Sequence, residues 1–206
     1  EEGQRAEIPG SSDQHLNGLD RLSKERIGAE MRKLLSAPDP APAMAAMRSS
    51  GVLLRVLEGA DDRMLALLVS LETQCDVRPN WLRRLAILRA MDARDSLRLS
   101  NYETQKLTVM RDEIGDMKPP HALGYYHGAP LAQDILLLRC ASFEQMPNNA
   151  DWNAAATGAE QVFPIKAHDL MPQYSGPELG QKLRALEAQW IDSEFRLTKK
   201  ALLSRV

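Results

Sequence analysis

Apolar residues recur along this chain at helical intervals. Ile27, Met31, Leu34 and Leu35 are spaced so that they share one face of a helix. No segment alternates apolar and polar residues over four or more positions, as a half-buried strand would. Similar helical patterns span residues 61–71, 81–91, 100–114, 130–143 and 176–191. The pattern predicts an all-α fold, an irregular array of eight to ten short helices.

Residues that begin or end helices punctuate this pattern. Ser23 precedes the first helical segment as an N-cap, and Ser100 with Glu103 forms a capping box. Further boundaries are expected at Pro38, Gly51, Gly115, Gly176-Pro177 and Thr198. Residues 52–57 predict a short helix, whereas residues 163–174 predict a proline-punctuated loop that contains His168.

Composition and charge narrow the functional classes. Apolar residues make up 44% of the 206 residues, which is enough for a packed core. The net charge of −2 argues against a strongly basic nucleic-acid domain, so any RNA contact must come from local Arg and Lys clusters. Cys75 and Cys140 are too few for a disulfide framework and predict a reducing cytoplasm. No apolar run is long enough to span a membrane.

The sequence offers little catalytic chemistry. We find neither a D-x-D pair on a strand nor a Walker A loop, so no catalytic residue is assigned. His168-Asp169 raises the possibility of a histidine–aspartate phosphohydrolase remnant, with His121 or His127 as a further ligand. Because His168 is expected in a loop, we predict an exposed histidine and no metal site. The two cysteines lie among apolar neighbours and predict packing roles.

Three segments have features that suit RNA, and each also has a purely structural interpretation. The helix at residues 22–35 carries Arg26 and Lys33, yet it is compatible with an ordinary amphipathic helix. Between residues 81 and 101, clustered guanidinium groups suit phosphate contacts, although a solvated helix face is the simpler interpretation. Gly176 and Gly180 open a helix whose free N–H groups could meet a phosphate, but Glu178 would repel one. The arginines of the second segment are Arg83, Arg84, Arg89, Arg94 and Arg98.

Taken in order, these segments resemble the C-terminal portion of the bacterial CCA-adding enzyme (tRNA nucleotidyltransferase) and poly(A) polymerase family. The first is similar to the E-R-I-x-x-E-x-x-K-L-L neck helix, here Glu25, Arg26, Ile27, Glu30, Lys33, Leu34 and Leu35. Leu97-Arg98-Leu99-Ser100-Asn101, with Glu103 and Leu107, resembles the L-R-L-S-N-x-E-x-x-x-L body motif. The family's tail signature resembles several segments here, namely Phe163-Pro164, Asp169-Leu170, Gly176-Pro177 with Gly180 and Leu183, Trp190-Ile191 and Phe195. The tail is most similar to α-proteobacterial enzymes, except that Ala167 replaces an expected glycine.

The resemblance implies a division into neck, body and tail. Residues 1–22 would be a linker or the end of the neck, residues 23–51 the neck helices, residues 52–116 a helical body and residues 117–206 a helical tail. The family's catalytic head precedes the neck motif, and its Gly-Ser loop with D-x-D and its nucleotide-selecting residues are not found here. The neck motif would brace the head through Glu25, Arg26, Glu30 and Lys33.

The resemblance also implies a function. The intact enzyme would add CMP and AMP to tRNA 3′ ends, or AMP to other RNA, with Mg²⁺ and CTP or ATP bound in the head. Its partners would be tRNA or other RNA and its own catalytic head, with no role for DNA or a membrane. The expected RNA-binding residues are Arg26, Lys33, Arg83, Arg84, Arg98, Lys106, Gly176, Gly180 and Lys182. The alternative is a helical protein-interaction module without an RNA role.

Overall fold

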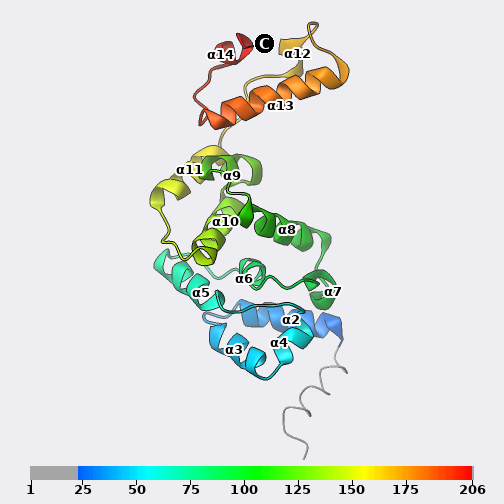
Figure 1. Cartoon of the computed structure of the whole chain (residues 1–206), viewed down its shortest axis with the longest axis vertical. Helices are drawn as coiled ribbons and strands as arrows, with labels where there is room; N and C mark the ends of the chain where they lie inside the picture. The colour runs from blue at the N-terminus through cyan, green and yellow to red at the C-terminus, as the bar shows by residue number, and fades with distance from the viewer. Residues whose placement is uncertain (1–22, 206) are drawn as a thin grey trace, which may run out of the picture. The chain divides into compact units, whose positions relative to one another are not determined.

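The computed structural model describes residues 23–205, which contain helices and no strands, so the predicted all-α fold class is confirmed. Thirteen helices lie within these residues, more than the eight to ten expected, because α7, α11 and α12 were not predicted as helices. In chain order (Figure 1) they are α2 (Lys24–Leu35), α3 (Ala41–Ser49), α4 (Val52–Val56), α5 (Leu65–Gln74), α6 (Trp81–Ile87), α7 (Ala93–Leu97), α8 (Asn101–Gly115), α9 (Pro120–His127), α10 (Ala129–Ser142), α11 (Asn149–Ala159), α12 (Ala167–Leu170), α13 (Gly176–Asp192) and α14 (Lys199–Leu203). None of them combines the length and apolar character that crossing a bilayer requires.

The chain divides into two compact units. The first extends to Met117 and also includes Leu137–Pro147, whereas the second comprises Lys118–Leu136 and the residues from Asn148 onward. Helix α10 therefore contributes its second half to the first unit and its first half to the second. This division does not separate residues 23–51 from residues 52–116. The neck, body and tail boundaries stay a prediction.

The first unit is built on buried aliphatic side chains contributed by most of its helices. Their burial removes apolar surface from water and is the main force that holds such short helices in place. Completely buried members include Leu35, Met44, Leu53, Leu65, Leu68, Leu85, Leu88 and Leu97. Leucine predominates in this core because its unbranched Cβ suits helices while its bulk fills the space between them.

Several helix ends follow the sequence signals. The Ser23 hydroxyl accepts from the N–H of Arg26, and the Thr198 hydroxyl accepts from the N–H of Ala201. Ser100 and Glu103 form the reciprocal capping box at the start of α8. Gly51 stands between α3 and α4 with a φ of 75°, a left-handed conformation that glycine adopts without steric cost.

The helix expected over residues 81–91 is shorter in the structure. Helix α6 ends at Ile87, and Arg89 takes a left-handed φ of 54°. The neighbouring segment 58–61 explains this end, because the Leu88 carbonyl accepts from the N–H of Asp61 and the Met91 N–H donates to Glu58. These tertiary hydrogen bonds replace the next helical turn. Met91 consequently lies 70% exposed and not in the core.

The second unit contains an unusually close helix pair, α9 and α11. A Cβ placed on Gly124 would lie 1.8 Å from the carbonyl oxygen of Ala155, and one on Gly158 would lie 2.0 Å from that of His121. Only glycine allows the two backbones to approach so closely. The contact face of α11 is therefore made of Gly and Ala, which explains why its apolar pattern predicted no clear helix.

The core of the second unit gathers around Trp190 on α13. Leu186 and Ile191 from the same helix, Leu170 from α12 and Leu202 from α14 are buried with it. Phe163 and Phe195 lie 5.5 and 4.8 Å from the Trp190 ring, centroid to centroid. This cluster fixes the C-terminal helices of the unit to one another.

The prediction that His168 lies in a loop was wrong. It belongs to the four-residue helix α12, where the Asp169 side chain accepts from the N–H of Lys166. Ala167 begins this helix without a left-handed φ, so glycine is not required there. The His168 side chain is nevertheless 72% exposed.

Candidate nucleic-acid interface

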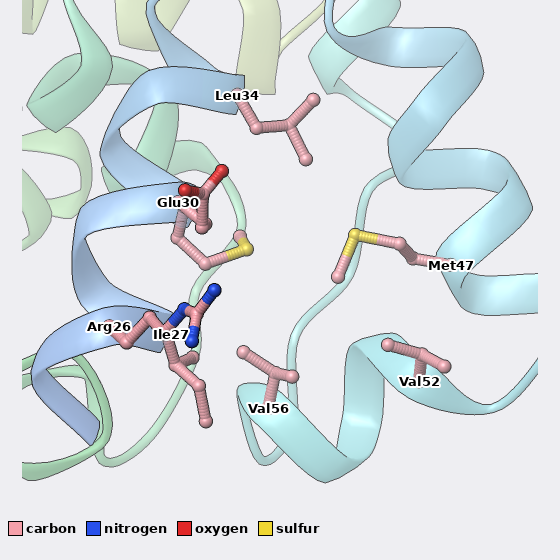
Figure 2. A pocket seen from close by; sticks show the side chains of 8 residues that line it. Arg26, Ile27, Glu30, Leu34, Met47, Val52 and Val56 are labelled. Carbon is pink, nitrogen blue, oxygen red and sulfur yellow. The ribbon is translucent and has the colours of Figure 1, made fainter. Parts of the chain in front are cut away.

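Helix α2 lines an open apolar groove on one of its faces. Ile27, Met31 and Leu34 form the α2 wall of a cavity of about 320 Å³. The opposite wall comes from α3 and α4 and consists of Met47, Val52 and Val56. Figure 2 shows the Arg26 and Glu30 side chains on the α2 side of this groove. Both are exposed, so the groove has an apolar floor with charged groups at its rim.

The other face of α2 packs closely on α7. A Cβ on Gly28 would lie 2.3 Å from the Leu97 carbonyl oxygen, which requires glycine at this crossing. The Arg32 guanidinium donates to the carbonyl oxygens of Leu97 (3.3 Å) and Arg98 (3.4 Å) and pairs with Glu103 (3.2 Å). The α2 segment and the segment 97–103 are thus joined directly, although about 70 residues separate them in sequence.

Charged groups reinforce this junction. The Arg98 Nε donates to Glu25 at 3.0 Å, between two exposed side chains. Partial burial opposes the ionisation of Glu103, but hydrogen bonds from Ser100 and Arg32 outweigh it and lower the pKa of this carboxyl below its ordinary value. The Arg32 guanidinium also lies 4.9 Å from the centre of the Trp81 ring, a cation–π contact. Arg32 is therefore the side chain that connects α2, α6 and α8.

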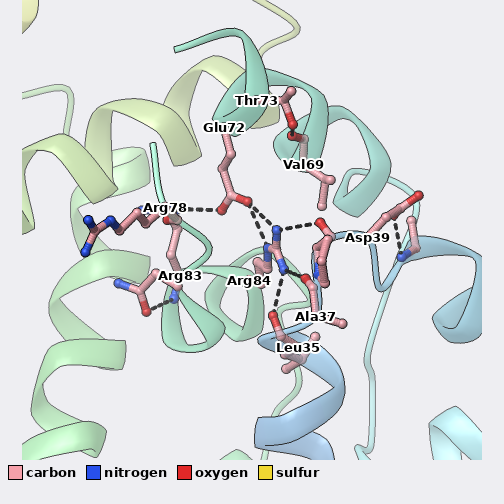
Figure 3. Close-up of polar contacts among 12 residues, drawn as sticks. Leu35, Ala37, Asp39, Val69, Glu72, Thr73, Arg78, Arg83 and Arg84 are labelled. Atoms are coloured by element: carbon pink, nitrogen blue, oxygen red, sulfur yellow. Dashed lines mark hydrogen bonds and ion pairs between the residues drawn. The ribbon is translucent and has the colours of Figure 1, made fainter. Parts of the chain in front are cut away.

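Arg83 and Arg84 do not reach solvent, and their prediction as RNA-binding residues was wrong. They are 2% and 1% exposed, and both pair with the buried Glu72 at 2.6 and 2.7 Å (Figure 3). Because both guanidinium groups are already bonded to Glu72 inside the core, they are not available to a phosphate. Arg83 also donates to the Arg78 carbonyl oxygen at 2.8 Å.

Arg84 instead supports the C-terminal end of α2. Its guanidinium donates to the carbonyl oxygens of Leu35 (2.8 Å), Ala37 and Pro38 (3.2 Å). Leu35 is the last residue of α2, and Ala37 and Pro38 follow it. The last carbonyls of a helix have no partner within it, and a cation there also complements the negative end of the helix dipole. Arg84 therefore holds one end of α2, while the Glu25–Arg98 pair lies at the other.

The remaining predicted cations of the first unit lie near the surface. Arg26 and Lys33 are exposed on α2, and Arg98 is exposed beside Glu25. Lys106 on α8 lies 4.8 Å over the ring of Tyr102, which is itself 65% exposed. Exposed cations, together with the half-buried Lys106 beside the exposed Tyr102 ring, suit contacts with RNA phosphates and bases. Arg32, Trp81 and Tyr102 were not among the RNA-binding residues predicted from the sequence.

The predicted residues of the second unit form a separate group at the start of α13. Gly176 has a φ of 55°, so glycine is favoured at this position. A Cβ on Gly180 would meet only the Arg184 side chain, at 3.6 Å. The Lys182 ammonium donates to the Arg205 carbonyl oxygen at 3.3 Å and lies 5.6 Å from the Tyr174 ring. Glu178 lies exposed in the first turn, where it would oppose an anion.

His121, Cys75 and the Asp169 side chain beside His168 are held by packing or polar contacts within the fold. The Nε2 of His121 lies 3.0 Å from the Ile191 carbonyl oxygen, and Asp169 beside His168 pairs with Lys199. Burial raises the pKa of the Cys75 thiol. Within residues 23–205, no three His, Cys, Asp or Glu side chains are grouped so that they could hold a metal ion.

A family model matches part of this chain. Residues 13–64 match a family model described as "Probable RNA and SrmB- binding site of polymerase A". The part of this match that the structure describes covers α2, α3, α4 and both walls of the apolar groove. No curated protein matches the chain. The match supports the resemblance to the poly(A) polymerase and CCA-adding family at a coarse level, and residues 13–64 are similar to an RNA-binding segment of polymerase A.

Proposed function

We propose that this chain is the RNA-binding portion of a tRNA nucleotidyltransferase of the CCA-adding type or of a poly(A) polymerase. In this proposal it positions the 3′ end of an RNA for nucleotide addition by a catalytic head outside these 206 residues. The observation that carries the proposal is the match of residues 13–64 to an RNA-binding segment of polymerase A. The order of the neck, body and tail motifs in the sequence adds to it.

The packing of α2 supports a bracing role for the neck motif. Gly28 and Arg32 attach one face of the helix to α7 and α8, and Arg84 holds its C-terminal end. The opposite face presents Arg26 and Glu30 beside the apolar groove. A helix fixed in this way can offer charged and apolar groups to a catalytic head with little loss of entropy on binding.

The RNA contacts in this proposal come from a few exposed or half-buried cations. Arg26, Lys33, Arg98 and Lys106 supply them in the first unit, and Lys182 in the second. Lysine and arginine contacts to phosphates position an RNA without reading its sequence. In this proposal, Mg²⁺ and CTP or ATP would be held by the catalytic head.

The proposal is tested by titrating the chain into a fluorescent tRNA transcript over a range of salt concentrations. We expect affinity to fall as salt rises from about 50 to about 200 mM, because binding releases counterions from the phosphates. Lys33→Glu with Lys106→Glu should weaken binding and reduce the salt slope by about two, one for each phosphate contact.

Arg196→Glu is the matched control, since Arg196 is exposed and already paired with Glu194. Arg196→Glu changes the net charge by the same amount as each of the two lysine substitutions, and it should leave the affinity for tRNA nearly unchanged. An affinity that the double variant leaves at the wild-type value would contradict the assignment of these two lysines. A chain that does not bind tRNA even at the lowest salt would contradict the proposed function itself.

One observation favours a second candidate, a helical protein-interaction module. The groove between α2, α3 and α4 exposes apolar side chains, as a docking site for another protein would. In that case the chain would bind no RNA, and Met47→Glu would abolish capture of the protein partner. RNA binding that survives Met47→Glu would favour the RNA-binding proposal.

A further inference from the structure

Two adjoining cavities of the first unit lie apart from the α2 groove. One of about 330 Å³ is lined by Arg89, Arg111, Ile114, Gly115 and Phe143. The other, of about 220 Å³, shares Arg89 and is lined by Ser142, by residues from the segment just before α5 and by the end of α6. Arg89 lines both hollows, and the adjacent residues Phe143 and Ser142 line the larger and the smaller one, respectively.

Arg111 lines the larger cavity, and part of its guanidinium group has no hydrogen-bond partner. Its Nε and Nη2 atoms are buried and have no hydrogen-bond partner, and the same is true of Ser142 Oγ. A guanidinium stays charged at neutral pH, so these donors cannot be relieved by loss of a proton. Buried polar groups are nearly always bonded, and an unbonded one is costly to the folded state.

The other buried arginines of the first unit have hydrogen-bond partners for their guanidinium groups, unlike Arg111. Arg83 and Arg84 share Glu72 and several carbonyl oxygens, and Arg139 donates Nε and Nη2 to the Glu113 carbonyl oxygen at 2.9 and 2.7 Å. Among the described residues, Arg111 is the arginine with buried unbonded guanidinium nitrogens. Burial alone lowers the pKa of Arg111, without an opposing contribution from a nearby carboxylate.

The charges around the cavity favour an anion. Arg89 is exposed at its edge and adds a second positive charge. The acidic side chain of the adjoining cavity, Asp61, is already bound through both oxygens by Arg63. Glu113 and Asp116 exert their electrostatic effect on Arg139. Phe143, 47% exposed, supplies an aromatic wall.

We propose that this cavity binds a nucleotide phosphate, with Arg111 and Arg89 as its ligands and Phe143 as the surface on which the attached base stacks. Arginine matches phosphate oxygens with paired N–H groups, and aromatic rings stack bases of any sequence. The phosphate site is argued from the contacts around the cavity. That the bound nucleotide is part of an RNA rests on the proposed function, and the alternative is that it is a free nucleotide.

The first experiment titrates inorganic phosphate at constant ionic strength and measures the melting temperature of the whole chain. Phosphate should raise the melting temperature of the wild type, because a ligand that binds the folded state stabilises it. Arg111→Met should lose this shift while keeping or raising the melting temperature without phosphate, since it removes the unbonded buried donors. Arg139→Met is the matched control and should lower the melting temperature but retain the shift.

Equal phosphate shifts in the wild type and Arg111→Met, or no shift in either, would overturn the proposal. So would a loss of stability in Arg111→Met as large as in Arg139→Met, which would give Arg111 a purely structural role.

The second experiment compares AMP with a short oligo(A) RNA by calorimetry. Wild type should bind AMP more tightly than inorganic phosphate, and Phe143→Ala should remove that difference. If RNA is the source, Arg111→Met should weaken oligo(A) binding about tenfold. If the free nucleotide is the source, the variant should lose AMP binding while oligo(A) affinity stays at the wild-type value. If Arg111→Met binds both AMP and oligo(A) as tightly as the wild type does, the proposed phosphate site is overturned, even if tRNA binding is intact.

Discussion

At the scale of single residues, arginines that the sequence alone does not distinguish have different roles in the structure. Arg83 and Arg84 are enclosed with Glu72, Arg32 joins two motif segments, and Arg98 lies exposed beside Glu25. A buried carboxylate between two guanidinium groups is stable only while all three partners remain. Glu72 lies on α5, about a dozen residues before the arginines, so spacing along α6 alone gave no sign of this partner.

Glu72→Gln should therefore destabilise the first unit strongly. It leaves two buried guanidinium groups without their anion, which should cost about 3–5 kcal/mol of unfolding free energy. Urea unfolding measures this loss. Glu58→Gln, at an exposed glutamate, is the control and should change stability by less than about 0.5 kcal/mol. A loss for Glu72→Gln no larger than that of the control would contradict the role of the buried triad.

The capping carboxylate Glu103 predicts a pH dependence. Its pKa is lowered from an ordinary 4.5, so its contribution to stability is present above that value and is lost as the pH falls through the folded-state pKa. Glu103→Gln should be less stable than the wild type at pH 7, and this difference should shrink at about pH 3. Thermal unfolding across this range measures it. A difference that stays constant, or grows in acid, would be incompatible with a stabilising ionised Glu103.

At the scale of helices, the clearest predictions came from caps and regular apolar spacing. Helix α8 follows its capping box, and α13 begins at Gly176 as expected. The chain turns at Arg89, however, because tertiary hydrogen bonds from residues 58–61 end α6. Helix α11 escaped prediction since its contact face consists of small residues. Local signals thus predicted where helices begin better than how they pack.

Gly28→Ala tests the close crossing of α2 and α7. The added methyl group would overlap the Leu97 carbonyl, so the helices must separate at a cost of about 1–3 kcal/mol. Gly115→Ala, in the same unit, has nothing within 4 Å of its Cβ and should be neutral or slightly stabilising. Chemical unfolding of both variants gives the comparison. Equal stability of the two variants would mean that the crossing tolerates a side chain.

At the scale of the whole molecule, a slightly acidic chain can still hold RNA if its cations are locally exposed. Although the net charge is −2, Arg26, Lys33 and Arg98 are exposed, and Lys106 lies beside the exposed Tyr102. The sequence predicted the helical class and several of these surface cations. It did not predict that Arg83 and Arg84 are internal or that Arg111 lacks partners, because both depend on contacts between distant helices.

Photo-crosslinking of a 4-thiouridine-labelled tRNA to the whole chain, with the attached peptides identified by mass spectrometry, tests RNA binding most directly. We predict crosslinked peptides from α2 and from the region of Tyr102 and Lys106, and their loss when unlabelled tRNA competes. Crosslinks that avoid both regions, or that unlabelled tRNA does not displace, would contradict the account.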